Sequence, residues 1–420
     1  MKDVIIRSVL FFSAAYCFLA ASAIDTNSLG DNRVPSNVAK YVTPHGAGSH
    51  SGNSWSNAYT LQEMIDHFSS NTNYNLIDST FIADSIPISG LSNIFFIGQG
   101  IDKTIIQGQS NPLNNDPFLW SIIGFDLDDA DNITIKNIQI RKFRGFGIRV
   151  DAASSNFFAY NDSIDLCGWA AIEDTTVIIR SPSGVKLYGD DATFRKSYIT
   201  NSGWDGMQIA GYRTLVDSSI IYWTGKDEPD AQYQGDGVHM FRNPDSSYWV
   251  PYYGDSIEVW KTGQATFIAC NINTVESKKS GIEGGWDSIY YDYGQDTVAY
   301  LLEKPLVQVY NSQITGGKGI GITQDAHPRL GHFYSSIKGN KIKSLDPERP
   351  TFRIDFADPS PYDTPQWGSI KNNTFYSPEG YTEDCPVLEF NTDSTAVLYL
   401  NNTWIKADTL TDFCVKHNAE

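Results

Sequence analysis

The stretch DNITIKNIQI, Asp131 to Ile140, consists of two short alternating strands joined by a polar corner. The same form returns four more times: ATFRKSYIT at Ala192 to Thr200, TLVDSSIIYW at Thr214 to Trp223, ATFIACNINTV at Ala265 to Val275 and LVQVYNSQIT at Leu306 to Thr315. Short runs of β-branched and aromatic residues between turn residues predict strands. A unit that returns at similar intervals is typical of a coiled solenoid.

A glycine-led strand follows each of these stretches. These strands are GFGIRV from Gly145, GWDGMQIAG from Gly203, QGDGVHMF from Gln234, KSGIEGG from Lys279 and GKGIGIT from Gly317. The glycines Gly206, Gly237, Gly281 and Gly319 are separated by 31, 44 and 38 residues, as expected for coils with loops of variable length. Two-residue hairpin turns between alternating strands are mostly missing. We therefore expect each strand to pair in parallel with its equivalent one coil later, at about 4.8 Å.

The N-terminus has the features of a secretory signal peptide. Lys2 and Arg7 precede an apolar run, and Ala21-Ser22-Ala23 is a small-x-small cleavage signal, so the signal peptide spans residues 1–23 and includes Cys17. No later segment reaches the roughly 18 consecutive apolar residues that a membrane span needs. We expect a secreted or periplasmic protein.

One helix is predicted near the N-terminus. Thr60 and Glu63 form a capping box, and Leu61, Met64, Ile65 and Phe68 share one helical face. This helix is well placed to cover the first open edge of the coil stack. The chain then divides into the signal peptide, a leader and N-terminal cap with the helix at 24–74, and a parallel β-helix domain at 75–420.

The charge is strongly acidic, with 31 basic and 49 acidic residues and a net charge of −18. This balance argues against nucleic acid or an anionic membrane as a partner, because such binding uses clustered lysines and arginines. An acidic polysaccharide is compatible with it, since a divalent cation can bridge carboxylates of protein and substrate. We expect a monomer.

Four cysteines remain after cleavage of the signal peptide. Cys167 and Cys270 are expected to be buried apolar residues, and none of the four has metal-type spacing. Cys385 and Cys414 could form a disulfide in an oxidising compartment, but four cysteines allow three pairings and the sequence does not choose among them.

At this point the chain resembles a known family. The phrases YVTPHGAGSHSGNSWSNA (Tyr41 to Ala58), NITIKN (Asn132 to Asn137) and GDGV (Gly235 to Val238) are similar to those of the secreted right-handed parallel β-helix proteins of the pectate-lyase-like superfamily. The resemblance covers nearly the whole mature chain. It implies the fold, but that fold hosts lyases, hydrolases, epimerases and phage-type adhesins, so it does not determine the reaction.

Alignment of the glycine-led strands brings polar residues together on one outer face. The residues predicted to lie there are Arg149, Asp205, Gln208, Asp236, His239, Ser280, Glu283 and Lys318. Asp205 and Asp236 are expected one coil apart, and like charges at that distance require either a proton on one carboxyl or a cation between them. Each Asp-Gly pair could instead be a structural turn, with the aspartate accepting backbone N–H bonds and the glycine adopting a positive φ.

The first functional hypothesis is a polysaccharide lyase that cleaves a uronic-acid polymer of the pectate or alginate type by β-elimination. The resemblance implies a Ca²⁺ ion held by carboxylates and a lysine or arginine base. Asp205, Asp236 and Glu283 would hold the ion. Lys279 would be the leading base with His239 its rival, and Arg242 or Arg329 would bind a substrate carboxylate. Gln208, His327, Trp249 and Trp286 complete the predicted substrate contacts, the tryptophans by stacking on sugar rings.

Three alternatives remain open. A glycoside hydrolase could use Asp205 and Asp236 as its two carboxylates. The paired aspartates, the Gly-His-Gly phrase and the Arg-x-Lys phrase of the polygalacturonase group do not occur in order here, however. A uronate epimerase shares the lyase chemistry up to the carbanion. A non-catalytic surface β-helix could bind glycans through its aromatic residues.

Overall fold

The computed structural model describes residues 37–108, 121–169, 172–173, 178–179, 182–222, 235–240, 242–252, 255–274, 280–284, 301–302, 306–324, 335–356, 368–390 and 397–418. The predicted signal peptide, residues 1–23, lies outside these ranges. The fold described below belongs to the unit formed by residues 39–420.

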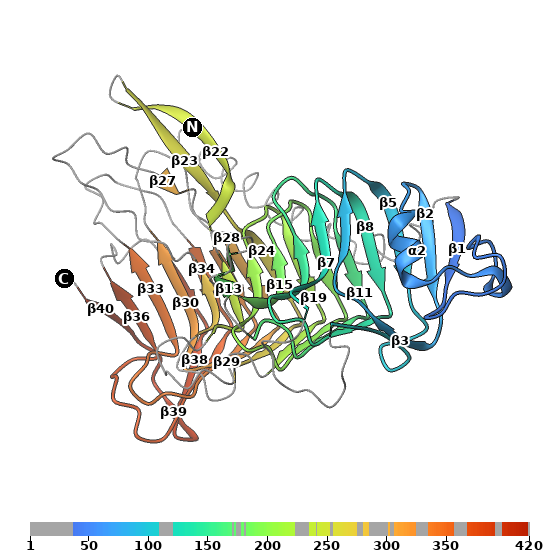
Figure 1. Cartoon of the computed structure of the whole chain (residues 1–420). Helices are drawn as coiled ribbons and strands as arrows, with labels where there is room; N and C mark the ends of the chain where they lie inside the picture. Colours follow the sequence, from blue (N-terminus) through green and yellow to red (C-terminus); the bar gives the residue numbers. More distant parts are fainter. Residues whose placement is uncertain are drawn as a thin grey trace, which may run out of the picture. The chain divides into compact units, whose positions relative to one another are not determined.

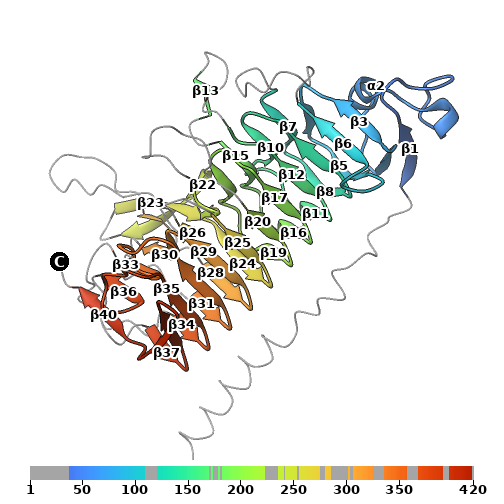
Figure 2. The same ribbon diagram turned by 90° about the horizontal axis from the view of Figure 1, so that it is seen from below.

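Three long sheets form the body of the protein, and each coil contributes one strand to each sheet in the order sheet 1, sheet 2, sheet 3 (Figure 1). Strands from successive coils lie side by side and pair in parallel, as Figure 2 shows from below.

Sheet 1 contains β1 (Val38–Val42), β2 (Thr72–Leu76), β5 (Ser92–Ile97), β8 (Asp131–Lys136), β11 (Phe158–Tyr160), β16 (Thr193–Arg195), β19 (Thr214–Asp217), β24 (Gln264–Ile268), β28 (Leu306–Tyr310), β31 (Ser335–Lys338), β34 (Gly368–Lys371) and β37 (Val397–Leu400). Sheet 2 contains β3 (Ser79–Ile82), β6 (Thr104–Gln107), β9 (Gln139–Arg141), β12 (Ser163–Asp165), β17 (Tyr198–Thr200), β20 (Ile220–Tyr222), β25 (Asn271–Asn273), β29 (Gln313–Gly316), β32 (Lys341–Ser344), β35 (Thr374–Ser377), β38 (Thr403–Lys406) and β39 (Thr409–Thr411). Sheet 3 contains β4 (Ile86–Ser89), β7 (Ile123–Asp128), β10 (Phe146–Val150), β15 (Ser183–Leu187), β18 (Asp205–Ile209), β21 (Val238–Met240), β26 (Ser280–Gly284), β30 (Lys318–Gln324), β33 (Phe352–Phe356), β36 (Val387–Phe390) and β40 (Val415–Asn418).

The predicted parallel β-helix is therefore confirmed, including the alignment of the glycine-led strands. The register pairs Met207 with Val238, Val238 with Ile282, and Ile282 with Ile320. All four side chains are fully buried in one continuous apolar cluster that runs through the coils. Stacking equivalent residues in this way buries a column of apolar area at every coil, which is the main stabilising contribution in a solenoid.

From β8 onward, the corner between sheets 1 and 2 has two residues, and each has its own task. The first adopts a positive φ in coil after coil, as at Asn137, Asn161, Asn311 and Asn372, where asparagine tolerates the left-handed region. The second is buried and satisfies the backbone of a neighbouring coil. Its column includes Asp162, Ser197, Ser219, Cys270, Ser312, Asn340, Asn373 and Asn402.

Cys270 belongs to this corner column, and both Cys167 and Cys270 are buried free thiols, as predicted. Burial raises the pKa of both thiols, that of Cys270 to about 12. A thiol in that state is a packing group rather than a nucleophile.

The N-terminal cap combines a helix with a strand. The predicted capping box at Thr60 and Glu63 is present and begins the helix α2 (Leu61–Asp66), which follows a single 3₁₀ turn η1 (Trp55–Asn57). Leu61 and Met64 of α2 pack into the apolar cluster. The segment predicted as a leader also supplies β1, which pairs on to the first edge of sheet 1, so a strand and the helix together close that end.

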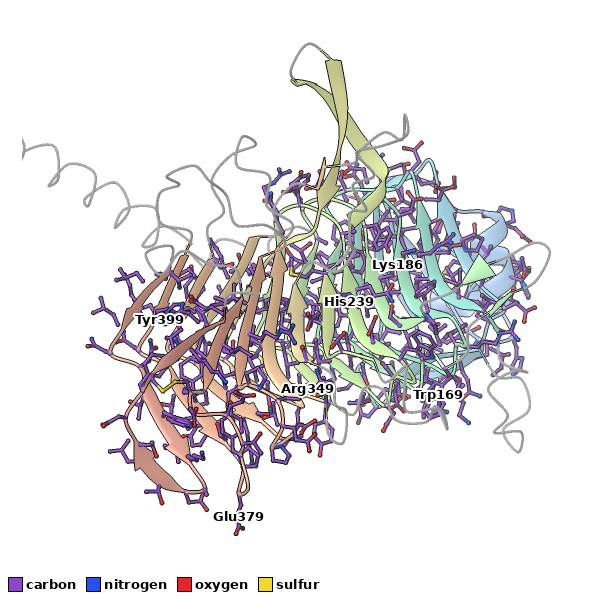
Figure 3. All side chains as sticks on the ribbon, turned by 90° about the vertical axis from the view of Figure 1, so that its left-hand side faces the viewer. Trp169, Lys186, His239, Arg349, Glu379 and Tyr399 are labelled. Atoms are coloured by element: carbon purple, nitrogen blue, oxygen red, sulfur yellow. A yellow bond between two sulfur atoms is a disulfide. The ribbon has the colours of Figure 1, made fainter. Side chains whose placement is uncertain are left out.

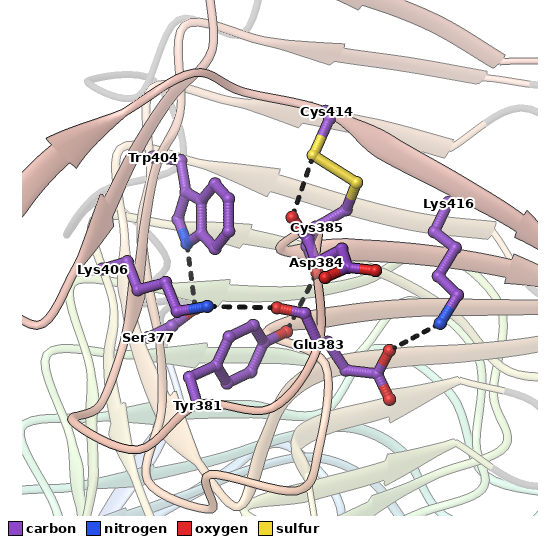
Figure 4. Close-up of a disulfide and its surroundings, with 9 residues drawn as sticks. All are labelled: Ser377, Tyr381, Glu383, Asp384, Cys385, Trp404, Lys406, Cys414 and Lys416. Carbon is purple, nitrogen blue, oxygen red and sulfur yellow. Dashed lines mark hydrogen bonds and ion pairs between the residues drawn. A yellow bond between two sulfur atoms is a disulfide. The ribbon is translucent and has the colours of Figure 1, made fainter.

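A disulfide joins Cys385 to Cys414 at the other end (Figure 4). This resolves the pairing that the sequence left open. The bond connects the segment before β36 to the segment before β40, the last strand of sheet 3. Lys416 and Glu383 form a 3.0 Å ion pair between the same two segments, so β40 is attached by both a covalent and an ionic link.

Besides the antiparallel pair of β38 and β39 at the end of sheet 2, two antiparallel pairs depart from the regular coils in the described part of the chain. The strands β13 (Ile172–Glu173) and β14 (Ile178–Ile179) form one of them. The other is a long hairpin of β22 (Arg242–Tyr252) and β23 (Asp255–Thr262), with β27 (Leu301–Leu302) parallel to β23. The long hairpin projects away from the three sheets directly after β21 (Figures 1 and 3). Among the described residues, no helix is long and apolar enough to cross a membrane.

Candidate functional site

The predicted polar row exists on the outer side of sheet 3. The register pairs Arg149 with Lys186, Lys186 with Gln208, Gln208 with His239, and His239 with Glu283. Lys186 and His239 lie along the same sheet in Figure 3. The alignment of the glycine-led strands omitted β15. This strand adds one coil between Arg149 and Gln208 and places Lys186 there.

The glycine at each corner explains why the aspartates join this row. A strict period of two would put Asp236 on the same side as Val238, opposite His239. A Cβ on Gly237 would lie 2.6 Å from Ile272 Cγ2, so Gly237 and Val238 both face the interior and the alternation is reset between them. Asp236 and His239 consequently share the outer side. The corner glycines Gly237, Gly281 and Gly319 do not have a positive φ, so the expected turn device is replaced by a close approach to the core.

Both aspartates use one carboxylate oxygen to hold the backbone of the next coil. Asp205 Oδ1 accepts a hydrogen bond from the N–H of Asp236 at 2.8 Å, and Asp236 Oδ1 accepts one from the N–H of Ser280 at 2.7 Å. Gln208 Nε2 donates to the other oxygen of Asp205 at 3.0 Å. The structural use of Asp-Gly that the sequence allowed is therefore real, and the Oδ2 atom of each aspartate is the one that faces His239.

His239 lies between the two carboxylates. Its Nδ1 is 3.6 Å from Asp205 Oδ2 and 3.6 Å from Asp236 Oδ2, and its side chain is 15% exposed. Burial alone would lower the pKa of His239, but the charges of Asp205, Asp236 and Glu283 outweigh burial and raise the pKa above its ordinary value. The imidazolium form is thus favoured inside a nearly closed, acidic site.

Glu283 completes the cluster from the next coil. Ser280 Oγ donates a hydrogen bond to Glu283 Oε2, which orients the carboxylate. Asp205, Gln208, Asp236 and Glu283 face away from the apolar interior, yet they are only 4%, 1%, 3% and 4% exposed. These residues are predicted to lie on an outer face. They do lie on that side of the sheet, but they form a buried polar centre there.

The donor atoms of this centre can be compared with those that a calcium ion requires. One ligand atom each from Asp205, Asp236 and His239 lies within 4.8 Å of the others. Ca²⁺ takes six to eight oxygen ligands, whereas an imidazole nitrogen suits transition metals. Here each aspartate has one oxygen bound to backbone, Glu283 is bonded to Ser280, and His239 faces both remaining aspartate oxygens. These residues fit a protonated histidine better than a calcium ion.

Several predicted site residues lie outside the described part of the chain. These are Lys279, Trp286, His327 and Arg329. Arg242 and Trp249 lie in β22, whose backbone is described but whose side chains are not. Their predicted roles stay predictions.

Ser280 occupies the position of Asp205 and Asp236 one coil on, as the alignment of the glycine-led strands predicts, and its side chain orients Glu283. One further residue of the site, Lys186, could have been found from sequence. Ser183-Gly184-Val185 repeats the pattern of Asp236-Gly237-Val238, which would have placed Lys186 beside Gln208.

No protein-family model and no curated protein sequence matches the chain. Solved structures do. The A-module of the mannuronan C-5 epimerase AlgE6 from Azotobacter vinelandii matches with 14% identity and a TM-score of 0.51, over 91% of this chain and 84% of that one. PfbA, a surface adhesin of Streptococcus pneumoniae, matches with 12% identity and a TM-score of 0.50, over 81% of this chain and 79% of that one.

Structural matches at identities this low show the fold and do not determine the reaction. The predicted resemblance to the pectate-lyase-like superfamily is confirmed at the level of the fold: the chain is a right-handed parallel β-helix protein with a short N-terminal capping helix.

Proposed function

We propose that this protein is a secreted carbohydrate-active enzyme, and specifically a polysaccharide lyase that cleaves a uronic-acid polymer by β-elimination. The observation that carries the proposal is His239, which is nearly buried between two carboxylates that are each held by the backbone of the next coil. A histidine held in this way is a proton-transfer group with a fixed position and a raised pKa.

In β-elimination, a base removes the proton at C5, a double bond forms between C4 and C5, and the C4–O bond breaks. The leaving oxygen then needs a proton. A raised pKa favours the protonated form of His239, so we assign it this role in place of the base that the sequence suggested. Asp205 and Asp236 stabilise the imidazolium before transfer, and Gln208 keeps Asp205 oriented.

The base and the group that binds the uronate carboxylate remain predictions on Lys279 and Arg242. Both are adjacent in sequence to described parts of the site. Lys279 directly precedes Ser280 of β26, and Arg242 begins β22 two residues after Met240. Lys279 would require a lowered pKa, which neighbouring cationic groups such as His239 and Arg242 would favour.

Hydrolysis by Asp205 and Asp236 is less compatible with the geometry. Inverting hydrolases separate their carboxyl groups by about 6.5–9.5 Å to admit a water molecule. Here one oxygen of each aspartate lies within 4.8 Å of the other, with His239 beside both. Oxygens this close argue against an inverting reaction. A retaining hydrolase, whose carboxyl groups lie about 5–5.5 Å apart, is disfavoured on a different ground, because each aspartate already holds the backbone of the next coil.

Epimerisation is the second candidate, because the matched AlgE6 A-module is named as a mannuronan C-5 epimerase. The first step would be the same removal of the C5 proton. The intermediate would then receive a proton at carbon, and the C4–O bond would stay intact.

A panel of polymers separates these reactions. The full chain is incubated with polygalacturonate, alginate and a neutral polysaccharide, with calcium and with a chelator. Unsaturated-uronate absorbance is the result we expect, and it should persist in the chelator. New reducing ends without that absorbance would indicate hydrolysis, and deuterium at C5 without chain cleavage in heavy water would indicate epimerisation. Either result would contradict the proposed lyase, as would no reaction on any acidic polymer.

A further inference from the structure

Two cations lie side by side on the outer row of sheet 3, on the N-terminal side of His239. Arg149 on β10 pairs in register with Lys186 on β15, and Lys186 pairs with Gln208, which is adjacent to His239. Strands in a sheet are about 4.8 Å apart, so Lys186 lies about two such steps from His239 and Arg149 about three. The row thus changes from cationic to acidic along one straight line of the sheet.

The surroundings of each cation hold it in place. Arg149 forms a bidentate pair with Asp126, with Nε 2.6 Å from Oδ1 and Nη2 2.9 Å from Oδ2. The Lys186 ammonium lies 4.0 Å from the ring centroid of Tyr188 and 5.3 Å from that of Phe146. An ammonium over aromatic rings keeps its charge while its stem is held against the surface.

The row is also more open than the centre that it leads to. The Arg149 side chain is 33% exposed and Lys186 is half-buried, whereas Asp205 and Asp236 are almost completely buried. In a chain with a net charge of −18, this row therefore places two neighbouring cations on an accessible part of sheet 3, beside the acidic centre, where they can attract an anionic polymer.

We propose that Lys186, with Arg149 beside it, binds carboxylate groups of the polymer on the N-terminal side of His239 and so aligns the chain along sheet 3. This inference deepens the proposed function and rests on it for the identity of the polymer. The Lys186 ammonium would contact the carboxylate, and the contribution of Arg149 is limited by the negative charge of Asp126.

Binding can be measured without turnover. In the His239→Gln background, retardation of the full chain is followed in gels that contain polygalacturonate, alginate or a neutral dextran, at low and high salt. Lys186→Gln is expected to weaken binding to an acidic polymer about tenfold at low salt, since one charge-assisted contact is lost. Lys186→Arg should retain binding, and Asp126→Asn should strengthen it.

The matched control is Lys341→Gln, an exposed lysine on β32 of sheet 2, which removes the same charge from another face. Equal weakening by Lys341→Gln and Lys186→Gln would overturn the proposal, because net charge alone would then explain binding. Unchanged binding in Lys186→Gln, or no retardation of the parent by either acidic polymer, would also overturn it. If binding depends on Lys186 but the wild-type chain turns over no polymer, the binding role of Lys186 would be supported and the lyase assignment would be wrong.

Discussion

At the level of single residues, His239 is the group whose surroundings set it apart. Its Nδ1 is equally distant from two carboxylates on different coils, and burial, which would lower its pKa, is outweighed by their charge. The same two side chains hold the backbone through their Oδ1 atoms, so the site and the scaffold share residues. Replacements must therefore change the charge and keep the hydrogen bonds that the two side chains accept from the backbone.

Asp236→Asn is such a replacement. The asparagine oxygen can still accept from the Ser280 N–H, while the charge 3.6 Å from His239 is removed. We expect the rate to fall about tenfold, and by about 10² or more in His239→Gln, where the proton donor itself is lost. Initial rates measured by unsaturated-uronate absorbance test this. The control is Asp191→Asn, which removes an aspartate paired with the exposed Arg213 and should leave the rate unchanged.

The pH dependence has a definite sign. His239 must be protonated to donate, so kcat/KM should fall as the pH rises through its raised pKa. The same ionisation contributes stability that is complete below the pKa of the unfolded state and is lost as the pH rises through that of the folded state. A pH profile of His239→Gln should lack this alkaline limb. An unchanged limb in that variant would assign it to another group.

At the level of elements, the corner before each strand of sheet 3 determines which side chains meet. Gly237 faces the core immediately before Val238 does, and this double inward step returns Asp236 to the side of His239. The pattern Asp-Gly-x-His thus works through a bend that simple alternation does not predict.

Gly237→Ala tests this bend. The new Cβ would lie 2.5 Å from the Gly281 carbonyl oxygen and 2.6 Å from Ile272 Cγ2, so the coils would have to shift. We expect a loss of about 1–3 kcal/mol in the free energy of unfolding, typical of an overpacked core. Urea unfolding followed by circular dichroism measures it. An unchanged midpoint would mean that the close approach is not required.

The sequence predicted the elements better than the contacts between them. The repeated strand pairs, the register of Gly237 with Gly281, and the capping box at Thr60 follow from local patterns, because stacking repeats the same chemistry at every coil. The position of Lys186 was missed because its coil begins with Ser183-Gly184 instead of Asp-Gly. The depth of burial of Asp205 and Asp236 depends on packing around the row, which no local pattern encodes.

At the level of the whole molecule, the two ends of the coil stack are closed by different means. The N-terminal end uses β1 and α2, whereas the C-terminal end relies on a disulfide and an ion pair that attach β40. Near this end, the buried Glu389 of β36 accepts a hydrogen bond from Tyr399. It also forms an ion pair with His417 of β40 at 2.9 Å. One disulfide and two ion pairs therefore hold the last coil in place.

Removing that bond should destabilise the C-terminal coils first. Cys385 and Cys414 are separated by 29 residues, and a loop of that length gives about 3–4 kcal/mol on the chain-entropy account. In the Cys385→Ser/Cys414→Ser double variant, we expect faster amide hydrogen exchange in β36 and β40 and little change in β5 and β8. Uniformly faster exchange along the chain would show that the coils unfold as one unit.

We expect Asp205 and Asp236 to hold His239 as an imidazolium, and an NMR titration of labelled histidine measures this protonation. The chain has seven histidines, and the His239 signal is assigned by its absence in His239→Gln. The arrangement predicts a midpoint above the ordinary histidine value of about 6.5, and a lower midpoint in Asp236→Asn. A midpoint at or below 6.5 in the wild-type protein, or the same midpoint in both proteins, would contradict it.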